Sequence, residues 1–246
     1  MSDDTAHSVS LLGIETATDA CSVALQIDGH IDQRHECNPR QHSRRLFPML
    51  AELLGQRAPA CLGLDAIVYG CGPGSFTGLR IAASAAQGLA FSLHLPVVPV
   101  STLACQAATA RRENAVPHGA AILSLLDANI GQVYWALYRI DTGGLEELMP
   151  PAVCAPEALP VAVIVEQLAE SVPLYHAGSG ATLVDGLPGL PVAARYADVL
   201  PEACDLLPFA RAALAGGAAQ TAADVSPVYV QDASRWKKLA EQGPRP

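Results

Sequence analysis

The same order of predicted elements occurs twice along this chain of 246 residues, and this repetition constrains the fold most strongly. Apolar runs separated by tight turns predict three consecutive strands, then a helix and a fourth strand, within residues 11–71. The same order returns within residues 120–177, although the side chains of the two halves are not similar. We therefore predict an α/β protein of two structurally related lobes, each built as β-β-β-α-β.

The bounds of the expected elements follow from hydrophobic periodicity and from turn residues. In the first half we expect strands at 11–16, 21–27, 30–37, 66–71 and 97–100, and helices at 46–54 and about 79–93. In the second half we expect strands at 120–126, 132–138, 145–149 and 174–177, and a helix at 156–170. These elements predict an N-terminal lobe at 1–110, a C-terminal lobe at 111–230 and a weakly ordered tail at 231–246.

The first helix carries a leucine-rich face. We expect Ser43 to cap its amino-terminal end, and Pro48 to kink the helix or delay its start. The apolar residues recur at helical spacing and so lie on one side: Leu46, Met49, Leu50, Leu53 and Leu54.

Composition excludes several classes of protein. Apolar residues make up 50% of the chain and charged residues 16%, so the chain can bury a sizeable core and is not intrinsically disordered. The net charge of −9 argues against strong binding of nucleic acid by this chain alone. Residues 81–110 contain no formally charged side chain. Polar residues and two prolines interrupt this stretch, so we expect no membrane span.

The cysteines and histidines predict no metal site. None of the seven cysteines forms a CxxC pair, and no histidine pair or cluster has metal-ligand spacing. Residues 1–10 are polar and acidic and do not resemble a signal peptide. We therefore expect a cytoplasmic protein without a metal or other cofactor.

A glycine-rich loop, GPGSFTG, joins the strand at 66–71 to the next helix and is a candidate phosphate site. Its glycines allow close backbone approach, and the helix that follows offers free N–H groups. The loop matches none of the Walker A, dinucleotide-binding and nucleophile-elbow patterns, so a close-packed turn without a ligand stays an alternative. The residues of the possible nucleotide or phosphate loop are Gly72, Gly74, Ser75, Thr77 and Gly78.

Two acidic residues, Glu15 and Asp127, end corresponding strands of the two predicted lobes. In a two-lobed phosphotransferase such acids hold a metal or act as a base. The simpler interpretation, which we favour, is that each acid caps the turn after its strand. No catalytic residue is predicted from these patterns.

The helix at 79–93 is apolar or small on nearly every side. Only Arg80, Ser84, Gln87 and Ser92 interrupt this character. A helix of this kind is normally buried all round, so a partner must cover it if it lies on the outside of a lobe.

Eight stretches in fixed order resemble the bacterial TsaB (YeaZ) family along nearly the whole chain. The segment GPGSFTGLRI, within residues 69–90, is a highly specific signature. The other stretches are IETATDACSVAL, RQHSRRLFPML, VPVSTL, LLDANIGQVYWALY, GSG, SPVYV and RWKKL. The resemblance implies the two-lobed fold of acetate and sugar kinases, actin and Hsp70, called the ASKHA or actin-like fold.

The resemblance also implies a role in making threonylcarbamoyladenosine, a modified base beside the anticodon of tRNAs that read ANN codons. In that family the catalyst is the related protein TsaD, which holds a metal with histidines, and the ATPase TsaE joins the assembly. The corresponding stretch here, residues 100–106, contains no histidine. We therefore expect a noncatalytic subunit that binds a TsaD-like subunit and reaches tRNA only through the complex.

Two positions depart from the family pattern. Glu15 stands where family members commonly have aspartate, and it keeps the charge. Gln231 stands where arginine is common, which weakens a contact of this residue with tRNA or a partner. The basic residues 235–238, RWKK, still offer such a contact, because a basic segment is attracted to phosphate.

We expect the two helices of the first lobe to pair side by side and to dock on the same helices of TsaD as a pseudo-twofold four-helix bundle. The same surface predicts a homodimer of the free chain. The alternative function is a small-molecule kinase or ATPase of the same fold, whereas no residue pattern supports a peptidase. The predicted interface residues are Leu46, Met49, Leu50, Leu53, Ala82, Ala83, Ala86 and Leu89.

Overall fold

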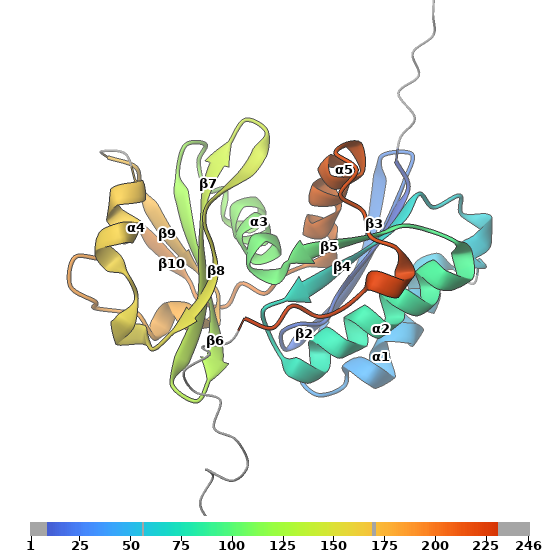
Figure 1. The fold of residues 1–246 in the computed structure, drawn as a ribbon, viewed down its shortest axis with the longest axis horizontal. Helices are drawn as coiled ribbons and strands as arrows, with labels where there is room; N and C mark the ends of the chain where they lie inside the picture. Colours follow the sequence, from blue (N-terminus) through green and yellow to red (C-terminus); the bar gives the residue numbers. More distant parts are fainter. Residues whose placement is uncertain (1–8, 56, 169–170, 231–246) are drawn as a thin grey trace, which may run out of the picture.

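Two five-stranded sheets with the same topology form the two lobes of the computed structural model (Figure 1), which describes residues 9–55, 57–168 and 171–230. The first sheet has the strand order β3-β2-β1-β4-β5, and the second has the corresponding order, β8-β7-β6-β9-β10. In each sheet the first strand pairs antiparallel with the second and parallel with the fourth. The duplicated, two-lobed actin-like architecture predicted from the sequence is confirmed.

The strands and helices have the following bounds. The first sheet contains β1 (Leu11–Glu15), β2 (Ala20–Ile27), β3 (His30–Cys37), β4 (Ala66–Gly72) and β5 (Val97–Ser101). The second contains β6 (Ala121–Asn129), β7 (Gln132–Asp141), β8 (Gly144–Cys154), β9 (Leu174–Ala177) and β10 (Ala194–Tyr196). The helices are α1 (His42–Leu54), α2 (Phe76–Leu93), α3 (Thr102–Asn114), α4 (Val161–Gln167) and α5 (Leu207–Ala215). Among the residues described, no helix combines the length and hydropathy needed to cross a bilayer.

Several predicted bounds are wrong for local reasons. The helix expected at 156–170 is a 3-10 turn at Pro156–Ala158 followed by the short α4, with Pro160 at its N-cap position. Strand β8 continues through two prolines to Cys154, because it is an edge strand, where a missing N–H costs little. Helix α1 begins at His42, with Gln41 rather than Ser43 at the N-cap, and includes Pro48 without a delayed start.

Helices cover both faces of the first sheet. Helices α1 and α2 pack on one face, and α5 with the preceding turn at Ala203–Leu206 packs on the other (Figure 1). Helix α3 lies between the lobes, because it contacts β4 and β5 of the first sheet and β6, β7, β8 and β9 of the second. Thus the chain returns to the first sheet after residue 203, so the first lobe includes residues far along the sequence. The division at residue 110 stays a prediction.

The residues predicted as a partner interface lie in the core of the first lobe. They are at most 5% exposed, except Leu89, which is partly buried against the same cluster. Their neighbours are the apolar residues of β1, β2 and β4. These side chains are covered by the chain itself, which corrects the prediction that they face a partner. The buried residues are Leu46, Met49, Leu50, Leu53, Ala82, Ala83 and Ala86.

We predict that the substitution Ala86→Glu disrupts folding itself. Ala86 is fully buried, and an unpaired carboxylate at this position costs about 3 kcal/mol or more of the free energy of unfolding. Ser84 lies two residues away on the same helix and is exposed, so Ser84→Glu should change stability by no more than ~0.5 kcal/mol. Urea unfolding followed by circular dichroism measures both variants. Equal stability of the two variants would contradict this placement of α2.

Candidate functional site

A cleft of about 510 Å³ lies between the two lobes. The turn after β1, the loop before α2 and the β6–β7 hairpin contribute most of its walls. The first strands of both lobes end here, because the two sheets have the same topology. The described residues that line it are Ala17, Thr18, Asp19, Gly74, Ser75, Phe76, Leu126, Asp127, Ala128, Asn129, Tyr134, Ser179 and Leu200.

Both acids predicted at strand ends bind the backbone two residues later, although only Glu15 ends its strand, because β6 continues past Asp127 to Asn129. Glu15 Oε1 accepts a hydrogen bond from Ala17 N at 2.6 Å, and Asp127 Oδ1 accepts one from Asn129 N at 2.7 Å. These hydrogen bonds are the ones that the turn-capping interpretation predicts, and the absence of a catalytic role stays a prediction. The two side chains differ in exposure, because Glu15 is fully buried whereas Asp127 lines the cleft.

Burial gives Glu15 an unusual protonation equilibrium. Burial raises the pKa of Glu15 from an ordinary 4.5 to about 7, although the hydrogen bond from Ala17 N lowers it, as do the nearby polar groups of Thr16 and Thr102. Its second oxygen, Oε2, has no hydrogen-bond partner among the described residues. A side chain at Gly70 would collide with this carboxyl group, so Glu15 fills the space beside β4 and does not face the cleft.

The loop before α2 is bound to the turn after β1. Ser75 N donates a hydrogen bond to Ala17 O at 2.7 Å, and Thr16 Oγ1 donates one to Gly78 O at 2.7 Å. A Cβ atom at Gly74 would collide with Ala17 O, and one at Gly78 with Thr16 O. These glycines are explained by close packing without a bound phosphate.

The remaining members of the candidate phosphate loop have separate structural roles. Ser75 Oγ accepts a hydrogen bond from Gly78 N at 3.4 Å and so caps α2. Gly72 adopts φ 121°, and a Cβ atom there would collide with Val228 O of the C-terminal segment. Thr77 is exposed and lines a groove between α1 and α2 instead of the inter-lobe cleft.

The start of α3, where the sequence contains no histidine, joins the lobes through a buried amide. Gln106 Nε2 donates to Ser124 Oγ at 2.9 Å and to Ala177 O at 3.0 Å, both in the second sheet. Ser101 Oγ caps the helix by accepting a hydrogen bond from Ala104 N. Ser101 and the amide nitrogen of Gln106 thus serve structure, whereas Thr102 Oγ1 is buried with no hydrogen-bond partner among the described residues.

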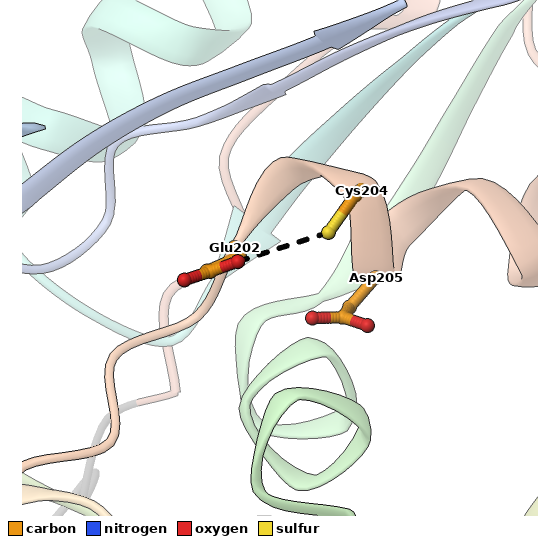
Figure 2. A group of neighbouring side chains, drawn as sticks. All are labelled: Glu202, Cys204 and Asp205. Atoms are coloured by element: carbon orange, nitrogen blue, oxygen red, sulfur yellow. Dashed lines mark hydrogen bonds between the residues drawn. The ribbon is translucent and has the colours of Figure 1, made fainter. Parts of the chain in front are cut away.

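One further group of acidic and thiol side chains was not predicted from the sequence. Figure 2 shows Glu202, Cys204 and Asp205 close together at the 3-10 turn Ala203–Leu206, which leads into α5. Arg112 of α3 already binds both carboxylates, with Nη2 at 2.6 Å from Glu202 and 2.9 Å from Asp205. Gln33 of β3 donates a further hydrogen bond to Glu202 at 2.7 Å. This cluster therefore ties α3 and β3 to the chain at residues 202–205.

The outward side of α1 and α2 carries exposed phenylalanines. Phe47 is 59% exposed, Phe76 55% and Phe91 75%. A groove of about 460 Å³ runs between the two helices, with Phe47, Phe76 and Ser84 among its lining residues. We call the three phenylalanines and this groove the aromatic face. The aromatic face was not predicted from the sequence. The available signal was Phe47, a large apolar residue that falls outside the buried leucine stripe of α1.

Part of the aromatic face is held by the C-terminal segment of the chain. The ring of Tyr229 lies 5.4 Å from that of Phe76, and Arg80 stacks over Phe76 at 3.8 Å. Arg80 Nε also donates a hydrogen bond to the Tyr229 hydroxyl at 3.1 Å. Gln87 donates to Ala222 O at 2.9 Å, so residues 222–229 cover one side of α2.

We predict that Glu15 makes stability fall as pH rises. In the unfolded chain this carboxyl ionises near 4.5, but in the folded chain it keeps its proton up to about 7. The unfolded state alone gains from ionisation in this window, so the free energy of unfolding should drop by ~3 kcal/mol between pH 4.5 and 7. Glu15→Gln should abolish this contribution.

The matched comparison is the wild-type chain against Glu15→Gln at each pH, by urea unfolding. Other groups cancel in this difference, including His176, whose pKa is lowered to about 4 by burial and whose contribution has the opposite sign. A difference that stays constant between pH 4.5 and 8 would show that Glu15 is ionised in the folded protein.

Comparison with known proteins agrees with the geometry. A family model described as TsaD, tRNA N6-adenosine threonylcarbamoyltransferase, matches residues 36–220. The tRNA threonylcarbamoyladenosine biosynthesis protein TsaB of Escherichia coli is 38% identical, over 93% of this chain and 97% of its own length. The protein of the same name from Haemophilus influenzae is 31% identical, over 95% and 98%.

A solved structure shows the same architecture. YeaZ from Pseudomonas aeruginosa superimposes with a TM-score of 0.80 and 38% identity, covering 90% of this chain and 99% of that one. These matches cover at least 90% of the chain and therefore include both lobes with their repeated strand order. The chain belongs to the TsaB (YeaZ) family.

Proposed function

We propose that this chain is a noncatalytic subunit of the complex that makes threonylcarbamoyladenosine in tRNAs reading ANN codons. Its role in this proposal is to bind and support a TsaD-like catalytic subunit. The aromatic face carries the proposal, because three exposed phenylalanines on two adjacent helices are unusual unless another protein covers them.

The shared fold suggests how the two subunits meet. The family model that matches this chain is that of TsaD, so both proteins are expected to present equivalent helices. Packing of α1 and α2 against the same pair in TsaD gives a pseudo-twofold four-helix contact. Phe47 and Phe76 are suitable anchors, because buried aromatic side chains contribute most to such interfaces. The same face supports a homodimer of the free chain, which TsaD must then displace.

The proposed assembly also includes a TsaE-like ATPase, and tRNA binds only through the complex. The net charge of −9 opposes binding of a polyanion by this chain alone. The basic residues 235–238 lie outside the described residues. We place the protein in the cytoplasm, where tRNA is modified.

The alternative, a small-molecule kinase or ATPase, receives less support from the cleft. Asp19 and Asp127 line it, and its described lining residues include no lysine, arginine or histidine. Without basic lining residues, a nucleotide's phosphates could bind here only if a divalent cation bridged them to the two carboxylates. The candidate phosphate loop is also bound to the turn after β1 through its own backbone.

We predict that Ser84→Glu abolishes the complex with TsaD while the variant stays folded. Ser84 lines the groove of the aromatic face, so a carboxylate there would be buried without a partner on association. We expect the dissociation constant to rise about 100-fold or more. Size-exclusion chromatography and calorimetry with purified TsaD measure the effect.

The matched control is Val163→Glu, which changes an exposed apolar residue on α4 of the other lobe and should leave the affinity unchanged. Phe47→Ala tests the same face by removing an anchor without adding charge. If both Ser84→Glu and Phe47→Ala bind TsaD like the wild type, the interface lies on another surface.

We also predict that the isolated chain binds tRNA weakly and neither hydrolyses ATP nor modifies tRNA. Filter binding at about 150 mM salt should detect tight tRNA binding only after TsaD is added. Submicromolar binding by this chain alone, or ATP turnover that copurifies with it and is lost in Asp127→Asn, would overturn the noncatalytic role.

A further inference from the structure

We propose that the inter-lobe cleft binds the C-terminal residues 231–246 of the same chain. In this arrangement the basic and aromatic part of the tail is an internal ligand of the acidic cleft. The cleft shares only Phe76 with the aromatic face, and the proposal does not rest on the proposed function.

The described chain ends beside the cleft. Val228 N donates a hydrogen bond to Cys71 O at 2.7 Å, and Tyr69 donates one to Ser226 O at 3.0 Å, so this segment is held along β4. Tyr229 packs on Phe76, which itself lines the cleft. In Figure 1 the last described segment, in red, runs past α2 toward the second lobe.

The charges of the cleft and the tail are complementary. Asp19 and Asp127 are exposed in the cleft, and neither has an ion-pair partner within the described part of the chain. Residues 231–246 contain Lys237 and Lys238, the only lysines of the protein, with two arginines and two acids, so their side chains carry a net charge of +2. Attraction between such groups is strengthened where a cleft partly excludes water.

The shape and chemistry of the cleft also suit the tryptophan of the tail. Its walls include the apolar or aromatic side chains of Phe76, Leu126, Tyr134 and Leu200. A cavity of about 510 Å³ is large enough for an indole ring and part of its neighbours. Trp236 presents a flat apolar ring between basic residues, so it can pack on these walls while the charges meet the two aspartates.

The tail is long enough to reach the site. Trp236 lies six residues after Val230, which allows an extended reach of about 20 Å. Because the tail is tethered next to the cleft, its effective concentration there is on the order of millimolar. At this effective concentration, an intrinsic dissociation constant of about 0.1 mM keeps the tail in the cleft about nine-tenths of the time.

Tryptophan fluorescence of the full chain tests the proposal directly. The protein has two tryptophans, and Trp135 is 5% exposed, so subtracting the spectrum of Trp236→Phe isolates the signal of Trp236. We expect this signal to be blue-shifted, with an acrylamide quenching constant at least about threefold below that of a free peptide of residues 231–246. Sodium chloride at about 1 M should raise the constant toward that of the peptide.

Two double variants identify the site. Asp19→Asn with Asp127→Asn, and separately Lys237→Gln with Lys238→Gln, should each expose Trp236 to quenching. Asp28→Asn is the matched control, because Asp28 is an exposed aspartate in the turn at the far end of β2 from Asp19. It should leave the protection of Trp236 intact.

Three outcomes would overturn the proposal. The first is a Trp236 that is as accessible as in the free peptide at low salt. The second is protection that survives the loss of both aspartates, which would place the tail elsewhere. The third is protection that disappears on dilution, which would show that a second copy of the chain supplies the contact.

Discussion

The turn after β1 is fixed from both sides, and the rest of the first lobe depends on this arrangement. Glu15 holds the turn from within by binding Ala17 N, while Ser75 N and Gly78 O bind the turn from outside. Only glycine fits at the two closest contacts of the loop, because any Cβ atom would collide with the turn. This contact sets where α2 begins, and hence one wall of the inter-lobe cleft and the position of the aromatic face.

Comparison of the two lobes shows how one topology supports different surfaces. In both lobes an acid at or near the end of the first strand binds the backbone N–H two residues later. In the first lobe that acid is buried beside β4, and its position favours the neutral form. In the second lobe the corresponding Asp127 faces the cleft. Both lobes therefore keep the same turn hydrogen bond, but only in the second lobe does the acid line the inter-lobe cleft.

Much of the fold could be predicted because strand order and hydrophobic period survive in the sequence. The predicted strands of both halves are present, and the repeated order gave the correct two-lobed architecture. Helices α3 and α5 were not predicted, because α3 is buried between the lobes and lacks one apolar stripe, whereas α5 returns to the first sheet from far along the chain. Such long-range packing leaves little local signal.

The candidate site was predicted less well, because periodicity identifies the buried side of a helix better than its functional side. The regular leucines and alanines of α1 and α2 proved to be core, whereas the outward Phe47, Phe76 and Phe91 interrupt the pattern. The glycine-rich loop was predicted as a candidate phosphate site, whereas Gly74 and Gly78 are explained by close packing against the turn after β1. Large apolar residues outside a buried stripe are the signal that sequence reasoning should have weighed.

The central claim, that α1 and α2 present their aromatic face to a TsaD-like subunit, is tested most directly by hydrogen–deuterium exchange of this chain with and without TsaD. Peptides from α1 (His42–Leu54) and α2 (Phe76–Leu93) should become protected on binding, while those from α4 (Val161–Gln167) should exchange as in the free chain. Protection confined to α4 or the second sheet, with α1 and α2 unchanged, would contradict the account.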